Sequence, residues 1–280
     1  MDLLYRGRMQ SAMLEDLTWV EAKAAIDAGM PVVIPIGAGA EAHGPHLPLR
    51  TDATIAAGLA RRVAERVPVL VAPLVPFGHD PAFVRFAGSQ SLSAATFAAL
   101  MRELCAGFVA QGASRIALLN TGRSSEAPIN AVLGELHAAG TARVVAAHLS
   151  FLGCAADSWL GDRDRGHAGE GETSMMLALD SRAVRLDRLP DRVANRDAGV
   201  RAMPPGLARP AVLSWSPGLG DADEFSPTGA FGDATRATAY KGQKVLEAIV
   251  DDIVAGLRHA FAAAPGFAPP AAGGDQSAAR

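Results

Sequence analysis

The chain has 280 residues, of which 49% are hydrophobic, and its formal net charge is −3 at pH 7. That length and apolar content are enough for one large domain with its own core, or for two small ones. Because there is no basic excess, we expect neither a nucleic-acid partner nor a polybasic membrane surface.

The N-terminal residues argue against export. Charges at Asp2, Arg6 and Arg8 interrupt the short apolar runs there, so we expect no signal peptide. No stretch approaches the roughly 18 uncharged apolar residues of a membrane helix. The two cysteines, Cys105 and Cys154, form no C-x-x-C pair, which indicates reduced thiols. We therefore predict a cytoplasmic protein that does not contact a membrane.

Helical periods alternate with short apolar runs over the first 180 residues. In the first cycle, Thr18 can cap a helix and Gly29 can end it, and a β-branched run follows that is too short for a helix. The predicted helices span residues 18–29, 51–67, 94–112, 125–140 and 170–179. The predicted strands span residues 31–36, 69–75, 115–120 and 142–149. This alternation predicts an α/β protein with a mostly parallel sheet covered on both faces.

The C-terminal third is less regular. Residues 182–231 are rich in Pro, Gly, Asp and Arg and lack periodicity, so we expect extended structure that edges the sheet or reaches a neighbouring subunit. Residues 234–262 return to an amphipathic helical pattern. We predict a single domain over residues 1–263 and a disordered tail over residues 264–280.

One loop after the first predicted strand concentrates polar side chains. It places Glu41, His43, His46 and Asp52 within twelve residues. Ligands of open α/β sheets bind at the carboxyl ends of strands, and Glu, Asp and His are ligand types of Zn²⁺ and Mn²⁺. In an extended segment Glu41 and His43 would point to opposite sides, which suits two metal positions bridged by Asp52. The alternative is an ordinary polar loop in which one histidine caps a turn.

Four segments resemble motifs of the creatininase (creatinine amidohydrolase) family. E-A-H-G-P-H-L-P-L-R-T-D, which ends at Asp52, resembles the family's E-x-H-G-x-H-L-P-x-x-T-D, and H-A-G-E-G-E-T-S, which begins at His167, resembles H-A-G-x-x-E-T-S. Residues 76–93 and 232–242 resemble two further motifs. The similarity runs in family order from about residue 18 to residue 257.

The resemblance implies a fold and an activity. The fold would be a three-layer α/β/α sandwich with a mostly parallel central sheet, assembled as a homo-hexamer. Family activities include creatinine ring opening, removal of a formyl group from a pyrimidine-pathway intermediate, and clipping of a redox-cofactor precursor peptide. We therefore predict a metal-dependent amidohydrolase that cleaves a non-peptide amide, cyclic or linear, of a small molecule with Zn²⁺ or Mn²⁺.

The same resemblance implies roles for five residues. Glu41 would bind one metal ion, His43 the other, and Asp52 would bridge them. Glu172 would complete the His43 position, and His167 would move protons near the substrate, as an imidazole near its unperturbed pKa can do. Without the resemblance, Glu172 would equally fit a first-turn carboxylate favoured by the helix dipole, and His167 a surface turn residue.

The chain departs from the family at one motif. N-G-H-G-G-N is replaced by N-T-G-R-S-S, so Gly122 stands at the position of a metal-binding histidine. The Glu41 position then keeps two carboxylates, which suit Mg²⁺ or Mn²⁺ better than Zn²⁺. The neighbouring Arg123 cannot be a ligand, but its charge could replace the missing ion or hold an anionic substrate group.

Several residues, and the function itself, allow alternative interpretations. His79 and His148 could replace the missing ligand, or be a turn histidine and a buried strand-end histidine respectively. We expect His46 to brace the loop rather than bind metal, and Phe83 and Trp159 to line the substrate pocket. Two alternatives to hydrolysis are a non-catalytic relative that binds a small anionic ligand and a non-hydrolytic reaction on the same scaffold, because function resides in the site.

Overall fold

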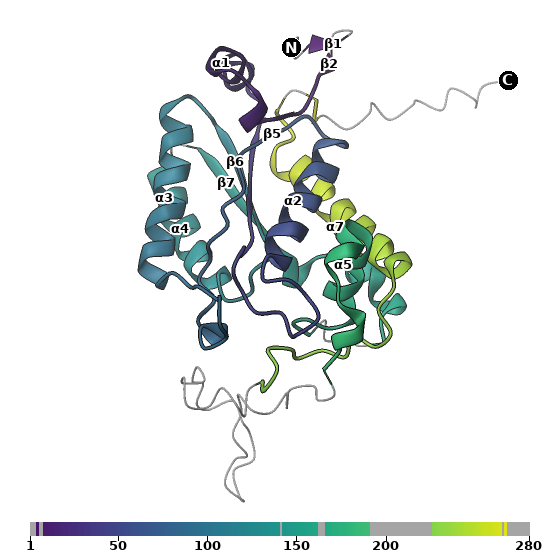
Figure 1. The fold of residues 1–280 in the computed structure, drawn as a ribbon. Coiled ribbons are helices and arrows are strands. Elements are labelled where there is room, and N and C mark those ends of the chain that lie inside the picture. Colours follow the sequence, from purple (N-terminus) through teal and green to yellow (C-terminus); the bar gives the residue numbers. More distant parts are fainter. Residues whose placement is uncertain are drawn as a thin grey trace, which may run out of the picture.

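A five-stranded parallel sheet forms the centre of the molecule, with strand order β3-β5-β4-β6-β7 (Figure 1). The computed structural model describes residues 4–5, 8–140, 142–161, 166–190, 226–264 and 266–267. The strands of the sheet are β3 (Ala12–Met13), β4 (Val32–Ile36), β5 (Leu70–Val71), β6 (Arg115–Asn120) and β7 (Arg143–His148). A separate antiparallel pair consists of β1 (Leu4–Tyr5) and β2 (Arg8–Met9).

Helices cover both faces of this sheet, which confirms the predicted three-layer α/β/α architecture (Figure 1). The helices are α1 (Trp19–Asp27), α2 (Thr51–Ala64), α3 (Ala94–Ala110), α4 (Glu126–Ala139), α5 (Glu170–Asp180) and α7 (Ala239–Ala260). Short 3-10 turns lie at η1 (Leu14–Asp16), η2 (Pro81–Phe83), η3 (Leu149–Phe151), η4 (Cys154–Trp159), η5 (Ser181–Ala183) and η6 (Leu186–Arg188). No helix in the described part of the chain is long and apolar enough to cross a membrane.

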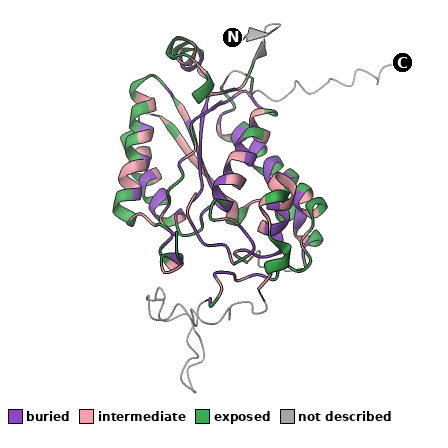
Figure 2. Cartoon of the chain, viewed as in Figure 1, coloured by how far each residue is buried: buried purple, intermediate pink, exposed green. Residues whose placement is uncertain are grey.

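Alternate residues of the central strand β4 pack into two separate cores. Val33 packs in the core formed with α2, α5 and α7, whereas Val32 and Ile34 pack in the core formed with α1, α3 and α4. All five residues of β4 are buried, because a parallel strand in the middle of the sheet has helices on both sides (Figure 2). This arrangement explains why the strand reads as a continuous apolar run.

Two elements are much shorter than predicted. The strand expected over residues 69–75 is reduced to β5, because Pro73 has no N–H to donate to a neighbouring strand. The helix expected from residue 234 begins at Ala239 as α7, because the side chain of Thr238 accepts a hydrogen bond from Lys241 N and caps it there.

The irregular segment of residues 182–231 is described only at its two ends, since residues 191–225 lie outside the described part. Its C-terminal end lies against the loop after β4, where Gly44 N donates to Gly229 O at 2.9 Å. Ordered chain also continues past the expected start of the tail at residue 264, because Phe267 is buried against Phe261. Residues 268–280 lie outside the described part.

Helices α5 and α7 approach each other closely at Gly242. A Cβ at this position would overlap the backbone carbonyl of Ser174, which belongs to α5. Hydrogen-bond contacts add to the packing, since Thr238 N donates to Ser174 Oγ at 3.2 Å. Because α5 also carries Glu172 in its first turn, the α5–α7 contact positions one of the predicted site residues.

Candidate metal centre

The predicted site residues meet where β4 ends and helices α2 and α5 begin. Asp52 lies in the first turn of α2, and the neighbouring Ala53 N donates to Ala38 O in the loop after β4 at 3.1 Å. The hydroxyl of Thr121, which follows β6, donates to the backbone carbonyl of Asp52 at 3.3 Å. The end of the sheet thus fixes the start of α2.

His43 is fully buried and presents one ring nitrogen to two carboxylates. Its Nδ1 donates to the backbone carbonyl of Glu41 at 3.0 Å, so Nε2 carries the lone pair of the neutral ring. Nε2 lies 3.3 Å from Asp52 Oδ1 and 3.8 Å from Glu172 Oε2. Metal-binding histidines typically donate their second ring N–H to a carbonyl in this way.

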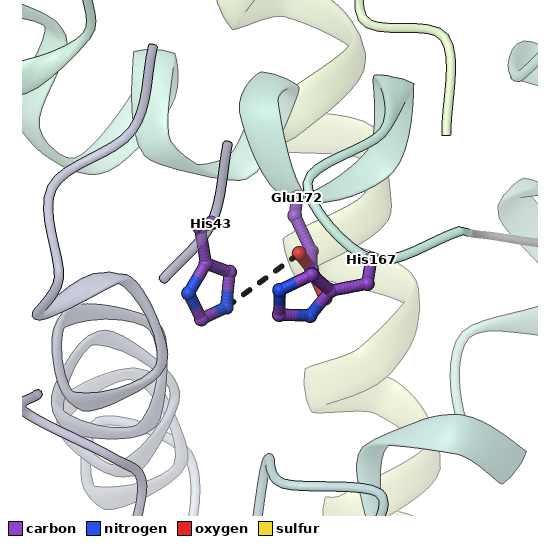
Figure 3. A group of neighbouring side chains, drawn as sticks. All are labelled: His43, His167 and Glu172. Carbon is purple, nitrogen blue, oxygen red and sulfur yellow. Dashed lines mark ion pairs between the residues drawn. The ribbon is translucent and has the colours of Figure 1, made fainter. Parts of the chain in front are cut away.

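Two overlapping groups of donor atoms form, and His43 belongs to both. One consists of Glu41, His43 and Asp52, and all its donor atoms lie within 4.8 Å of one another. The other consists of His43, His167 and Glu172, with the same limit on its donor atoms, and its three side chains are drawn in Figure 3. The expectation that Glu41 and His43 point to opposite sides is therefore wrong. The His43 ring folds back onto the carbonyl of Glu41, which its Nδ1 approaches to 3.0 Å.

His167 is held between two rings beside this cluster. Its Nε2 donates to the carbonyl of Ala42 at 2.7 Å, which leaves Nδ1 as an acceptor. The ring stacks on Phe83 with centroids 4.1 Å apart and tilts against His43 at the same distance. Burial, followed by the charge of His43, lowers the pKa of His167 to about 3, so the expectation of an unperturbed pKa is wrong.

The site contains more buried carboxyl groups than imidazole rings that can balance their charge. Burial and then the charge of Asp52 raise the pKa of Glu41 well above its usual value, and burial raises the pKa of Glu172 to about 7. Burial disfavours the imidazolium form of His43, but its hydrogen bond to Asp52 and the surrounding carboxylates outweigh this and raise its pKa to about 10. Burial likewise disfavours the Asp52 carboxylate, but the His43 hydrogen bond and charge lower the pKa of Asp52. One imidazole cannot balance several carboxylates, so the donor set fits a divalent cation.

This imbalance predicts that metal-free protein loses stability as pH rises. The pKa of Glu172 is raised to about 7 and that of His43 to about 10, so both groups bind protons more tightly in the folded state. Their stabilising contribution is complete at low pH and is lost as pH rises through those values. The lowered pKa values of His167 and His46 act in the opposite direction up to about pH 6.5, but Glu41 and Asp80, whose pKa values are also raised, add to the loss. In denaturant titrations of chelator-treated protein, we therefore expect a lower free energy of unfolding at about pH 8 than at about pH 5.

The variant Glu172→Gln should reduce that pH dependence, because its side chain does not titrate. Adding Mn²⁺ should stabilise the wild type more at the higher pH, where the carboxylates are free to bind it. Equal stability of the metal-free protein at both pH values would contradict the predicted charge imbalance.

The other predicted residues lie around the cluster rather than in it. His46 is buried, and its Nε2 lies 2.9 Å from Thr173 Oγ1, so it ties the loop to α5 as expected. His79 Nδ1 donates to the carbonyl of Leu92 at 2.9 Å, which matches a turn histidine. His148 lies between the side chains of Asn120 and Asn130, which matches a buried strand-end histidine.

The side chains of Arg123 and Trp159 are exposed. The Arg123 side chain is exposed, and within the described residues it forms no ion pair with Glu41, so the structure does not show it in the place of an ion. Its predicted contact with an anionic substrate group stays a prediction. Trp159 is 44% exposed and packs edge-on against Tyr240, with ring centroids 5.6 Å apart. Phe83, in contrast, is stacked on His167.

One acidic residue near the cluster was missed in the sequence. Asp80 is 3% exposed, and burial followed by the charge of Asp52 raises its pKa to about 7. It follows His79 directly in the chain. A carboxylate directly after His79, in a chain that lacks one family histidine, was the signal that could have identified it.

The chain is similar over most of its length to proteins of one family. The creatininase family model, described as creatinine amidohydrolase, matches residues 15–257. The mycofactocin precursor peptide peptidase of Mycobacterium tuberculosis is 33% identical over 233 residues, which cover 80% of this chain and 82% of that protein. The creatinine amidohydrolase of Pseudomonas putida is 29% identical over 272 residues, which cover 90% of this chain and 98% of that protein.

Solved structures show the same fold. A structure titled creatininase Mn has a TM-score of 0.75 at 26% identity and covers 90% of this chain and 99% of its own. A mutant creatininase described as a Zn–Zn type has a TM-score of 0.74 at 26% identity with the same coverage. The structural similarity therefore extends over most of both chains.

Proposed function

Because the chain belongs to the creatininase family, we propose that it is a metal-dependent amidohydrolase that cleaves a carbon–nitrogen bond of a small, non-peptide amide with water. The observation that carries this proposal is the position of Nε2 of buried His43, which faces carboxylate oxygens of Asp52 and Glu172. We propose Asp52, His43 and Glu172 as ligands of one ion, with Glu41 on the other side of Asp52.

The ion would supply Lewis-acid chemistry, because a divalent cation polarises a carbonyl and lowers the pKa of water. Residues of the protein would hold the ion, move the proton and limit solvent access. Glu172 is oriented by Ala168 N, which donates to its Oε2 at 2.7 Å. His167 is fixed through Nε2, so its Nδ1 is the nitrogen that can accept a proton and pass it to the leaving nitrogen. Burial lowers the pKa of His167, and the charge of Asp52 acts against that shift and favours the protonated ring. The Phe83 ring limits solvent access on the far side of His167.

The class of bond that is cleaved and the identity of the metal are also proposals. One similar protein carries the name of a creatinine hydrolase and another the name of a peptidase, so a peptide substrate is the second candidate. We propose Zn²⁺ or Mn²⁺, because imidazole with carboxylates suits both ions. A cytoplasmic homo-hexamer is proposed from the composition and the family resemblance. A non-catalytic or repurposed site is the alternative, since Gly122 lacks the family's imidazole.

Metal content and hydrolysis can be measured on the same preparation. Protein purified without chelator should contain at least one equivalent of Zn or Mn by elemental analysis, and it should hydrolyse a substrate in a panel of creatinine, N-formyl amines and short peptides. The variant His43→Ala should lose both metal and turnover. His137→Ala is the matched control, because His137 is exposed on α4, and it should change neither.

Three outcomes would redirect the proposal. Absence of metal under every loading condition would favour the non-catalytic alternative. Bound metal without hydrolysis across the panel would favour non-hydrolytic chemistry. Hydrolysis of peptides alone would replace the proposed non-peptide class with the peptide class.

A further inference from the structure

A buried ion pair joins the first turn of α5 to the first turn of α7, two helices that lie side by side (Figure 1). Glu170 is 1% exposed, and its Oε1 accepts from Lys241 Nζ, whose side chain is 19% exposed. Buried pairs are screened much less than exposed ones such as Lys244–Glu247 on α7. The Glu170–Lys241 pair therefore constrains how the starts of the two helices meet.

Glu170 also holds the chain that precedes α5. Its Oε2 accepts from Gly161 N at 2.6 Å, so the carboxylate joins residue 161 to residue 170. On the other side of the pair, Lys241 Nζ donates to Arg236 O at 3.1 Å. A Cβ at Gly161 would lie 2.6 Å from Arg236 Nη1, which places this guanidinium beside the same backbone. The ion pair thus ties the chain before α5 to the chain before α7.

The same two segments meet at His167. The carbonyl of His167 accepts from Phe231 N at 2.8 Å and from Gly232 N at 3.2 Å. The segments touch through their backbones, because a Cβ at Gly169 would lie 2.8 Å from Gly232 Cα. No side chain separates them there, so a shift of the chain before α7 would be passed directly to His167.

Glu170 and Glu172 lie two residues apart in the first turn of α5 and serve different contacts. Side chains at this spacing do not face each other on a helix. Glu170 contacts α7, whereas Glu172 points toward His43, with 3.8 Å between Oε2 and Nε2 (Figure 3). Ala168, whose N–H donates to Glu172, has left-handed backbone with a φ of 55°, which is unfavourable for alanine and has to be held by surrounding contacts. The orientation of this turn therefore decides where Glu172 points.

We propose that the Glu170–Lys241 ion pair is a positioning pair, which fixes Glu172 and His167 in the geometry that the metal centre requires. The pair acts through these two residues and contacts neither the ion nor the substrate. This inference rests on the proposed function, because it assigns the pair to the site of that function. The alternative is a purely structural role, in which Lys241 only balances the charge of a buried carboxylate.

Mn²⁺ affinity of the full-length protein tests the proposal, with free Mn²⁺ measured by electron paramagnetic resonance. Lys241→Met should bind Mn²⁺ at least about 10-fold more weakly than the wild type, as is typical when a residue that orients metal ligands is lost. Removing one partner of a buried pair also lowers stability. Ile129→Ala is the control for that loss, because Ile129 is buried in the core on the other face of the sheet, and it should keep wild-type affinity.

The double variant Glu170→Gln/Lys241→Met separates positioning from charge balance. It removes both charges of the pair, and its amide oxygen can still accept from Gly161 N, so it should regain stability in denaturant titrations. It lacks the ion pair between α5 and α7, so its Mn²⁺ affinity should stay as low as that of Lys241→Met. Wild-type affinity in the double variant would overturn the inference, because charge balance would then account for the pair.

A measurement on metal-free protein keeps this inference apart from the proposed function. The ring of His167 is stacked on Phe83 with centroids 4.1 Å apart, so ring currents shift its C–H signals in nuclear magnetic resonance spectra. These signals should move in Lys241→Met and in the double variant, but not in Ile129→Ala. Unchanged signals in Lys241→Met would contradict the inference and leave the proposed function standing. A wild type that binds no Mn²⁺ would remove the proposed function, and the His167 signals would still decide whether the pair positions that ring.

Discussion

Replacing Asp52 with alanine is expected to abolish metal binding and to lower kcat/KM by at least about 10³-fold. Asp52 Oδ1 lies 3.3 Å from His43 Nε2, and the same carboxylate belongs to the donor group with Glu41. Its removal therefore takes a ligand from both proposed positions. Elemental analysis and steady-state kinetics on the variant give the two readouts.

The fold should tolerate this change. The backbone carbonyl of Asp52, which accepts from Thr121 Oγ1, is unaffected by truncation of the side chain. Loss of an acid from the first turn of α2 costs roughly 0.3–1 kcal/mol of helix stabilisation. Asp180→Ala is the matched control, since Asp180 pairs with Arg50 at the surface, and it should keep metal and activity. Wild-type metal content in Asp52→Ala would contradict the role of Asp52 in both positions.

Gly242→Ala is expected to lower the free energy of unfolding by at least about 3 kcal/mol. The new Cβ would overlap the carbonyl of Ser174, and backbone of a packed helix cannot move aside as the end of a flexible side chain can. Helix α7 would have to separate from α5, which carries Glu172. Denaturant titration measures the loss, and Mn²⁺ affinity should fall with it.

Gly256→Ala is the matched control on the same helix. Nothing lies within 4 Å of a Cβ at Gly256, so alanine meets no obstacle there. Because glycine costs helix interiors roughly 0.5–1 kcal/mol relative to alanine, this variant should be slightly more stable than the wild type. Equal effects of the two substitutions would contradict the close helix contact at Gly242.

The sequence determined the fold and the position of the centre. The buried run of β4 followed by a polar loop could be predicted because apolar periodicity and turn residues are local properties. The spacing of Glu41, His43 and Asp52, with the family resemblance, placed the centre at the carboxyl end of the first long strand, and all three residues meet there. The family itself followed from motif order along the chain, which requires no knowledge of contacts.

Only the tertiary structure decided how the side chains are arranged. The inward fold of His43 depends on a carbonyl within its own loop, and the low pKa of His167 depends on burial against Phe83 and His43. The exposure of Arg123 and the burial of Asp80 beside Gly122 depend on loops that are distant in sequence. Such contacts form when packing brings separate elements together, and composition and spacing carry no information about the space between them.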